Sequence, residues 1–263
     1  MKNPSTIAQS HTPLCGPAAF LYCVASKAPD VYARYILDLC LHGEASIGGL
    51  RVRPSAACRN ASLDGNINAV DWIGLASLRD SENRVTRLDA AGGGARLGIA
   101  GLTMPGALRS WFAASGLFAS TYQDNDFIAH NRLDRLLKAG EKHEHGAFVC
   151  LLVRAAILGH GAGGAVGLDK LGKGTPKSWL PSPDHWVVMS SPLHADGLTA
   201  PTTTGLPDYT HQDEIPTHHP LLNRRLTFTV YTWGRNDWRV DNVVHPLTVE
   251  QFLPYFHGFV AAR

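Results

Sequence analysis

Apolar residues recur at helical spacing through the first half of the chain. Residues 17–25 form an almost continuously apolar run, and residues 29–41 carry apolar side chains three and four positions apart. The same spacing returns at residues 69–78, 104–115 and 126–139. The pattern therefore predicts five helices before residue 140.

Polar residues and glycines mark the bounds of two of these helices. Asp30 and Thr103 stand where a helical pattern begins, so their side chains are predicted to be N-caps. Gly43 and Gly116 stand just after such a pattern, and glycine readily adopts the left-handed conformation that ends a helix. Both helices therefore have a predicted beginning and end.

The pattern changes at Gly146, after which strand-like segments dominate. Residues 147–153 are continuously apolar with β-branched members, which is typical of a buried strand. Residues 226–234 alternate between apolar and polar positions, as a half-buried strand does. Shorter strands are predicted at residues 117–122, 184–189 and 238–240. Thr248 is the predicted N-cap of a C-terminal helix that ends near Gly258.

Together these elements predict an α+β fold in a single domain over residues 1–263. Helices dominate residues 1–145, and a small antiparallel sheet is expected within residues 146–263. Segments rich in glycine or polar residues are predicted loops at residues 89–98, 158–183 and 192–223.

Composition narrows the classes of protein that fit. Because 44% of the 263 residues are hydrophobic, the chain can bury one substantial core or two small ones. A net charge of +2 at pH 7 gives no strongly basic surface, so no nucleic-acid partner is expected. No apolar run has the length that crosses a bilayer, and the first ten residues lack the apolar stretch of a signal peptide. We therefore expect synthesis in the cytoplasm, no membrane span, and any export by a route without a cleaved leader.

The first half of the chain is locally basic. Its arginines include Arg34, Arg51, Arg53, Arg79, Arg84 and Arg87. Such a cluster is expected to form a solvated face or to face an acidic partner.

The cysteines are expected to be reduced. There are five of them, an odd number without the spacing of a disulfide framework. Cys23, Cys40 and Cys150 lie in apolar patterns and are predicted to be buried in the core.

Neither a metal nor a cofactor is predicted. His143 and His145 have the spacing of neighbouring metal ligands, as do Cys40 and His42, but no second pair completes a site with four ligands. The glycine-rich stretches lack the endings of phosphate-binding loops.

The segment from Gln9 to Phe20 carries the strongest chemical signal. It reads QSHTPLCGPAAF and places Cys15 at the mouth of an apolar helix. The positive end of a helix dipole and a neighbouring imidazolium both favour the thiolate, which is the nucleophilic form of cysteine. Pro17 suits the first helical turn, and Gly16 would let a substrate backbone approach the sulfur. A buried structural thiol is the alternative interpretation of Cys15.

Gln9, six residues upstream, could donate a side-chain N–H to an oxyanion that forms beside Cys15. The segment from Gln9 to Phe20 resembles the N-terminal active-site segment of papain-like cysteine hydrolases. It is most similar to the branch that includes bacteriocin-leader-processing peptidases and phytochelatin synthases. The resemblance covers the first 25 residues well and the last 80 loosely. It implies a papain-like fold, with the cysteine on a helix of the N-terminal part, the glutamine in the oxyanion hole and the base on a strand of the sheet.

His185 is the predicted base. It opens the apolar strand DHWVVM, in the order of cysteine then histidine that the resembled family uses. An imidazole within hydrogen-bonding reach of the thiol takes its proton and later returns it to the leaving amine. In the resembled family an asparagine or aspartate orients this imidazole and lies shortly before a Trp-Gly pair.

Thr232 occupies that third position here, directly before Trp233 and Gly234. Its hydroxyl would accept a hydrogen bond from the imidazole more weakly than a carboxylate does. Nearby alternatives are Asn236, Asp237 and Asp241. A dyad assisted by a main-chain carbonyl or a water also stays open. Trp233 is expected to pack over His185 or into the core.

These residues predict a cysteine-dependent hydrolase of an amide bond, either a protease or an amidase. One alternative is a catalytically idle papain-like binding or adaptor module, which the missing asparagine or aspartate before Trp233 favours. Another is an acyl transferase or deamidase that uses the same pair, Cys15 and His185.

A second resemblance concerns residues 71–80, DWIGLASLRD, and residues 230–234, VYTWG. Both segments look similar to toxin modules of bacterial effectors, including those delivered by type VI secretion. The resemblance implies a bacterial antagonistic effector that acts on a peptide or another amide-containing substrate. It also implies a cognate immunity protein as the partner.

Overall fold

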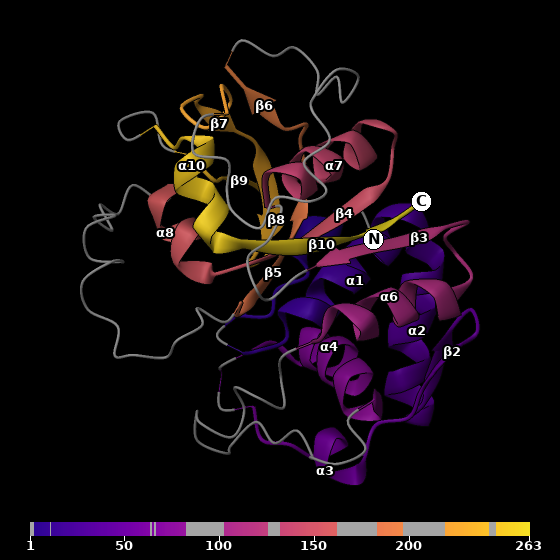
Figure 1. Cartoon of the computed structure of the whole chain (residues 1–263). Helices are drawn as coiled ribbons and strands as arrows, with labels where there is room; N and C mark the ends of the chain where they lie inside the picture. The colour runs from indigo at the N-terminus through magenta and orange to yellow at the C-terminus, as the bar shows by residue number, and fades with distance from the viewer. Residues whose placement is uncertain are drawn as a thin grey trace. The chain divides into compact units, whose positions relative to one another are not determined.

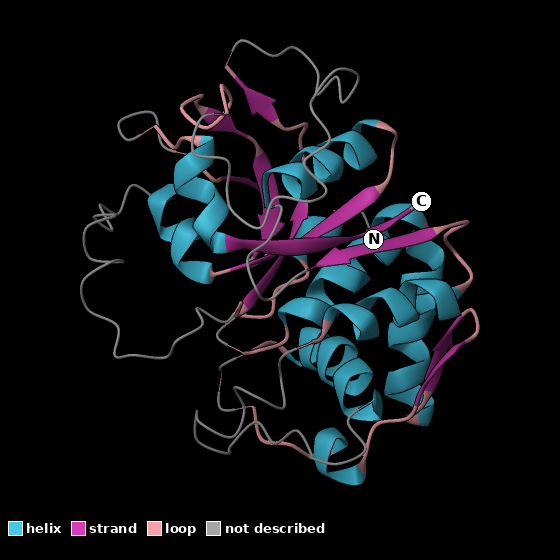
Figure 2. Cartoon of the chain, in the orientation of Figure 1, coloured by secondary structure: helices cyan, strands magenta, loops and turns pink. Residues whose placement is uncertain are grey.

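The computed structural model describes residues 3–10, 12–63, 65, 67–82, 103–125, 132–161, 183–196, 219–241 and 246–263. The predicted loop at residues 89–98 lies outside the described residues, and so do most of the loops at 158–183 and 192–223. The described part contains both helices and antiparallel strands, which confirms the α+β class (Figure 2).

The chain divides into two compact units (Figure 1). The first consists of Met1–Thr121, Thr232–Arg235 and Ala262–Arg263, and the second of Tyr122–Tyr231 and Asn236–Ala261. The prediction of a single domain stays a prediction, and each unit is described by itself.

Four helices form most of the first unit. They are α1 (Cys15–Lys27), α2 (Pro29–His42), α4 (Ala69–Glu82) and α6 (Pro105–Ser115). Helix α1 contacts the other three, and nearly all of its side chains are buried. An apolar run without a polar face is typical of such a central helix. Phe20 of α1 packs against Trp111 and Phe112 of α6, with ring centroids 5.9 and 5.1 Å away.

Shorter elements complete the first unit. They are the 3₁₀ helix η1 (Pro4–Thr6), the strands β1 (Ala45–Ile47) and β2 (Leu50–Val52), and the short helix α3 (Ala56–Arg59). Strands β1 and β2 pair antiparallel as a hairpin that packs on α2.

The predicted glycine ends of α2 and α6 are confirmed, but the predicted N-caps are wrong. Gly43 and Gly116 adopt left-handed conformations with φ of 71° and 66°. Ala28 is the N-cap of α2, and Asp30 lies in the first turn, where a carboxylate still complements the helix dipole. Met104 is the N-cap of α6.

A six-stranded sheet dominates the second unit, in the order β3-β10-β4-β5-β8-β9. The strands are β3 (Thr121–Asn125), β10 (Phe256–Ala262), β4 (Phe148–Val153), β5 (His185–Met189), β8 (Thr229–Thr232) and β9 (Arg235–Arg239). Strands β4 and β5 pair antiparallel, with Val153 opposite His185, and β5 pairs antiparallel with β8. The small antiparallel sheet predicted for the second half is therefore present, and His185 lies at the start of one of its strands.

Further elements surround this sheet. They are α7 (Arg132–Glu144), η2 (Ala155–Ile157), α8 (Leu158–Gly161), the paired strands β6 (His194–Ala195) and β7 (Leu226–Thr227), α10 (Val249–Phe252) and η3 (Leu253–Tyr255). Helix α7 packs against β4. The helix predicted at residues 126–139 continues to Glu144, and residues 126–131 lie outside the described part of the chain. The strand predicted at 226–234 is interrupted at Phe228.

The C-terminal segment differs most from its prediction. Thr248 is an N-cap as expected, and it forms a capping box with Gln251. Helix α10 is only four residues long, however, and Pro254 lies in the 3₁₀ turn that follows. The chain then continues as β10, whose seven residues are all buried. The predicted helix end at Gly258 is therefore wrong, because this glycine lies within a strand.

Two of the three predicted core cysteines are confirmed. Cys23 and Cys150 are fully buried, whereas Cys40 is exposed on α2. Within the described residues, no helix is long and apolar enough to cross a membrane.

Candidate functional site

Cys15 is the first residue of α1 and is 3% exposed. The N-cap is Leu14, which offers no side-chain acceptor to the amides of the first turn. Amides at a helix N-terminus carry partial positive charge, and this charge favours an anion beside them. The thiol thus lies where the sequence analysis placed it, with α1 beginning two residues earlier than the predicted run.

Gly16 is required here for a different reason from the predicted one. A Cβ added at this residue would overlap the side chain of Thr103, which is itself buried. Glycine therefore permits close packing between the start of α1 and Thr103, the residue before the N-cap of α6. The expectation that a substrate backbone approaches the sulfur beside Gly16 stays a prediction.

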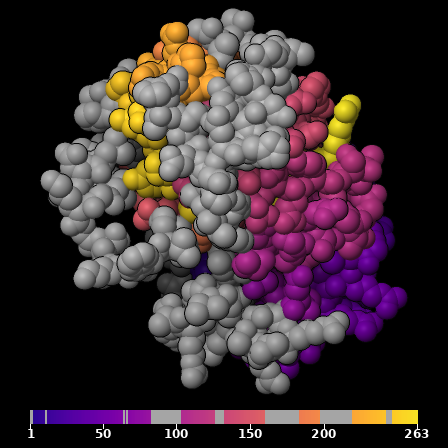
Figure 3. Space-filling model, in the orientation of Figure 1, coloured from indigo at the N-terminus to yellow at the C-terminus, as the bar shows by residue number. Residues whose placement is uncertain are grey.

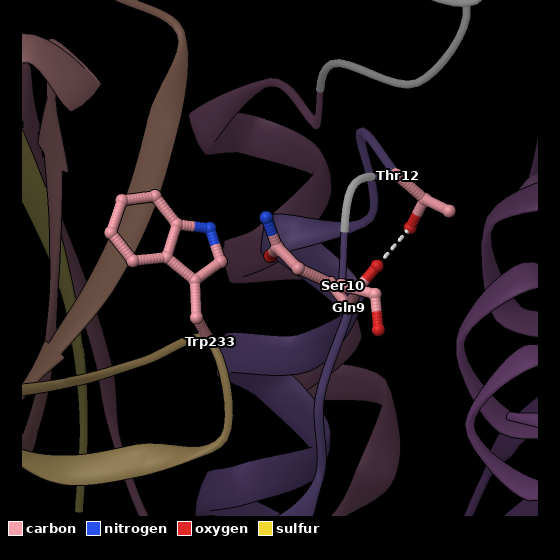
Figure 4. Close-up of a pocket in the computed structure, with 4 residues that line it drawn as sticks. All are labelled: Gln9, Ser10, Thr12 and Trp233. Atoms are coloured by element: carbon pink, nitrogen blue, oxygen red, sulfur yellow. Dashed lines mark hydrogen bonds between the residues drawn. The ribbon is translucent and has the colours of Figure 1, made fainter. Parts of the chain in front are cut away.

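Gln9 lines a cavity of about 510 Å³ together with Ser10, Thr12 and Trp233. All four belong to the first unit. Figure 4 shows the Gln9 amide and the Trp233 indole projecting into the space between their two segments. The Thr12 hydroxyl donates a hydrogen bond to the Gln9 carbonyl oxygen at 2.6 Å, which fixes the turn after Gln9.

Two of these lining residues have unusual backbone conformations. Ser10 and Trp233 have φ of 52° and 47°, and among the described residues they are the only non-glycine residues with positive φ. Such conformations cost free energy and persist where the surrounding structure imposes them, often at functional sites. Both lie at this cavity, which marks it as the leading candidate site of the first unit.

The neighbouring turn is packed onto the N-terminal segment. Gly234 has φ of 79°, and a Cβ there would lie 3.0 Å from the Ala8 Cβ. The backbone N–H of Ala8 also donates a hydrogen bond to Asp71 of α4. Burial raises the pKa of the Asp71 carboxyl, and this hydrogen bond only partly opposes the rise. The turn at Gly234 and helix α4, both distant in sequence, thus contact Ala8 immediately before Gln9.

Thr232 is the last residue of β8, belongs to the first unit and is buried. It directly precedes Trp233 in the sequence. The alternatives Asn236 and Asp237 lie on β9 in the second unit. Asp241 is also buried in the second unit, where its carboxylate pairs with Arg225 at 2.7 Å and with Arg239 at 3.0 Å. These two ion pairs give Asp241 a structural role.

His185 belongs to the second unit, where it is buried at the start of β5. The Asp184 carboxylate beside it accepts a hydrogen bond from the Ala155 backbone at 2.6 Å, so this residue anchors the strand start. Burial lowers the pKa of His185 to about 4. The imidazole is therefore neutral at neutral pH, and its burial disfavours the imidazolium that would stabilise a thiolate.

Arg79 of α4 was expected on a solvated face or facing an acidic partner, but it is buried in the first unit. Burial lowers its pKa, while the charges of Glu82 and Cys15 act in the opposite direction. The sequence did contain a signal, since Arg79 continues the spacing of Trp72 and Leu75 on the buried face of the helix.

Within the described residues, no group of three or more histidine, cysteine, aspartate or glutamate side chains is arranged to hold a metal ion. Comparison of the chain with family models, with curated proteins and with solved structures found no match.

Proposed function

We propose that the protein is a cysteine-dependent hydrolase of an amide bond with a papain-like catalytic arrangement. The observation that carries the proposal is the placement of the Cys15 thiol at the N-terminus of α1, where partial positive charge favours a thiolate. The cavity lined by Gln9 and by two residues with positive φ supports it. The motif around Cys15 resembles that of papain-like enzymes, and the resemblance implies that Cys15 is the nucleophile and that Gln9 belongs to the oxyanion hole.

In this mechanism the Cys15 sulfur attacks the carbonyl carbon of the amide. The Gln9 side chain and the Cys15 main-chain N–H donate hydrogen bonds to the oxyanion of the tetrahedral intermediate. The neutral His185 imidazole takes the thiol proton and transfers it to the leaving nitrogen as the C–N bond breaks. A water molecule, deprotonated by His185, then hydrolyses the thioester and regenerates the thiol. Thr232 is proposed to accept a hydrogen bond from the imidazole.

Alkylation by iodoacetamide tests the proposed nucleophile without a known substrate. We expect Cys15 to be modified at pH 6 at least about tenfold faster than Cys40, because only a thiolate reacts and Cys15 has a helix N-terminus and Arg79 beside it. Cys40 is the internal control, as it is exposed on the same unit. Peptide mass spectrometry of the modified protein gives both rates.

The variants His185→Ala and Arg79→Gln separate the contributions to this reactivity. Loss of the Cys15 advantage in His185→Ala supports the catalytic pair, and a smaller loss in Arg79→Gln supports the electrostatic role of the arginine. A Cys15 rate no higher than that of Cys40 in the wild type would contradict the proposal.

A binding or adaptor module is the second candidate function. The residue before Trp233 is Thr232 rather than asparagine or aspartate, so the orienting hydrogen bond to an imidazole would be weak. An acyl transferase or deamidase would use the same thiol and differs only in what attacks the thioester.

We further propose that the protein is an antagonistic effector with a cognate immunity protein. Expression in bacteria, in the cytoplasm and separately with a periplasmic leader, is expected to stop growth in one compartment only. Growth should be normal with Cys15→Ala, because the thiol is the attacking group. Equal toxicity of the two forms would favour the binding module, and absence of toxicity in both compartments would contradict the effector role.

A further inference from the structure

His257 of β10 has two buried ring nitrogens, and neither has a hydrogen-bond partner among the described residues. The side chain as a whole is 1% exposed. A neutral imidazole carries one N–H donor and one acceptor nitrogen. Buried polar atoms are hydrogen-bonded in the great majority of folded proteins, and an unsatisfied one costs free energy. A ligand from solution that bonds to this imidazole would therefore stabilise the second unit.

Two arginines are anchored to the backbone just before His257. Nη1 of Arg132, on α7, donates a hydrogen bond to the Leu253 carbonyl oxygen at 2.8 Å. The backbone N–H of Arg154, which follows β4, donates to the Tyr255 carbonyl oxygen at 2.9 Å. The Arg154 guanidinium lies over the Tyr255 ring, 5.5 Å from its centre. We name Arg132, Arg154 and His257 the basic cluster, and all three belong to the second unit.

Both guanidinium groups act on the imidazole. Burial is the main cause of the lowered pKa of His257, and the positive charges of Arg132 and Arg154 lower it further. The basic cluster therefore combines two cations with an imidazole whose nitrogens are unsatisfied in the described part of the chain. An anion is the kind of ligand that such a combination attracts.

The basic cluster extends from the interior of the second unit toward its surface. Arg132 is 5% exposed, whereas Arg154 is half-buried. Pro254 of η3 is exposed. In Figure 3, yellow atoms reach the surface where Figure 1 shows α10 and η3. We therefore infer that the side of the cluster that faces solvent is at Arg154.

We propose that the basic cluster binds a phosphate group. The planar guanidinium of arginine donates paired hydrogen bonds to phosphate oxygens. A phosphate monoester carries about −1.5 to −2 charges at pH 7, which matches two guanidinium groups, whereas a carboxylate carries only one charge. The N–H of His257 supplies a further donor to a phosphate oxygen. This site lies in the second unit and goes beyond the proposed hydrolysis at Cys15.

Isothermal titration calorimetry of the full chain with inorganic phosphate at pH 7 measures this binding. The Cys15→Ala background avoids toxicity during expression, and the ionic strength is held constant so that screening is equal in every titration. We expect a dissociation constant on the order of 0.1 mM. Acetate should bind at least about tenfold more weakly, because its single charge leaves one guanidinium charge uncompensated.

Methyl phosphate distinguishes the two sources of a phosphate group. Tighter binding of methyl phosphate than of inorganic phosphate supports a phosphorylated small molecule as the ligand. Tighter binding of inorganic phosphate supports the free ion. Both results agree with the proposed chemistry of the site.

Side-chain variants test whether the basic cluster is the site. Arg154→Gln should weaken phosphate binding at least about tenfold, and Arg154→Lys should recover part of this loss because it restores the charge. His257→Phe should also weaken binding, by about threefold or more, because it removes the N–H donor. Arg109→Gln is the matched control, since Arg109 is exposed on α6 and its replacement removes the same net charge. This control should bind phosphate like the parent.

Three results would overturn the proposal. One is the absence of any binding heat up to about 10 mM phosphate, which would leave water as the partner of His257. The second is an Arg154→Gln variant that binds phosphate as tightly as the parent. The third is acetate that binds as tightly as phosphate. None of these titrations uses the Cys15 thiol, so their outcome is independent of the alkylation test of the proposed hydrolase.

Discussion

Acidification from pH 7 to pH 4 is expected to remove on the order of 6 kcal/mol of folding stability, through two buried histidines. His185 and His257 each have a pKa lowered to about 4, against about 6.5 in an unfolded chain. The unfolded state therefore binds more protons than the folded state between these values. Stability from each histidine is fully present above pH 6.5 and is lost as the pH falls toward 4. A shift of this size corresponds to about 3 kcal/mol for each histidine.

His257 provides the sharper test because its environment is well defined. It is 1% exposed on β10, and neither ring nitrogen has a hydrogen-bond partner in the described part of the chain. Burial lowers its pKa, and the positive charges of Arg132 and Arg154 lower it further. Protonation would add a third positive charge to this group, with no described partner for the new N–H.

The variant His257→Phe should make the protein more resistant to acid. Urea unfolding at steps of half a pH unit between pH 7 and pH 4 gives the free energy of unfolding at each pH. In His257→Phe the slope of this free energy against pH should be smaller than in the wild type by up to one proton, or about 1.4 kcal/mol per pH unit. Stability at pH 7 should change little, because an apolar ring replaces polar atoms without partners. His145→Gln is the control for the loss of a histidine at an exposed position, since His145 lies on the loop after α7. An unaltered slope in His257→Phe would contradict the prediction.

The variant Gly258→Ala is expected to destabilise the protein by about 3 kcal/mol or more. Gly258 has φ of 129°, a conformation that residues with a Cβ rarely adopt. A Cβ there would also overlap the Asp124 carbonyl oxygen and lie 2.5 Å from the Asn125 Cα, both on β3. Backbone atoms cannot rotate aside, so the strands would have to separate and lose packing.

Urea unfolding at pH 7 measures this loss as a lower midpoint. Gly106→Ala is the matched control, since Gly106 lies in α6 with no atom within 4 Å of an added Cβ. This control should be neutral or slightly stabilising, because alanine favours helix more than glycine does. Equal midpoints for the two variants would show that β10 does not pack tightly against β3.

Local signals in the sequence were sufficient where a single residue type decides the structure. Gly43 and Gly116 end their helices because only glycine adopts the left-handed conformation without cost. Thr248 was identified as a cap from its residue type and position, and in the structure its side chain and that of Gln251 accept hydrogen bonds from each other's backbone amides. The apolar run of β4 was identified because its continuous β-branched and apolar residues match a strand buried on both faces.

Elements that depend on distant residues were not predictable in the same way. The sequence FHGFVAA is short and apolar, so its periodicity fits a helix or a strand, and pairing with β3 and β4 decides for the strand. Cys40 fits a helical apolar pattern, yet the packing of α2 leaves it on the exposed side. At the candidate site, Gln9 and Cys15 were found from their motif. The contribution of Trp233 to the cavity that Gln9 lines depends on a turn more than 200 residues away in sequence, and no local pattern encodes it.

The positive φ angles of Ser10 and Trp233 have a consequence for laboratory evolution of this protein. Glycine at either position would relieve the backbone cost, so selection for heat resistance alone should enrich glycine at residues 10 and 233. Glycine at 233 would also delete the indole that forms one wall of the cavity beside Gln9. Heat-resistant lineages should therefore lose this wall of the cavity, and lineages selected for heat resistance and for the proposed hydrolase activity together should keep the tryptophan.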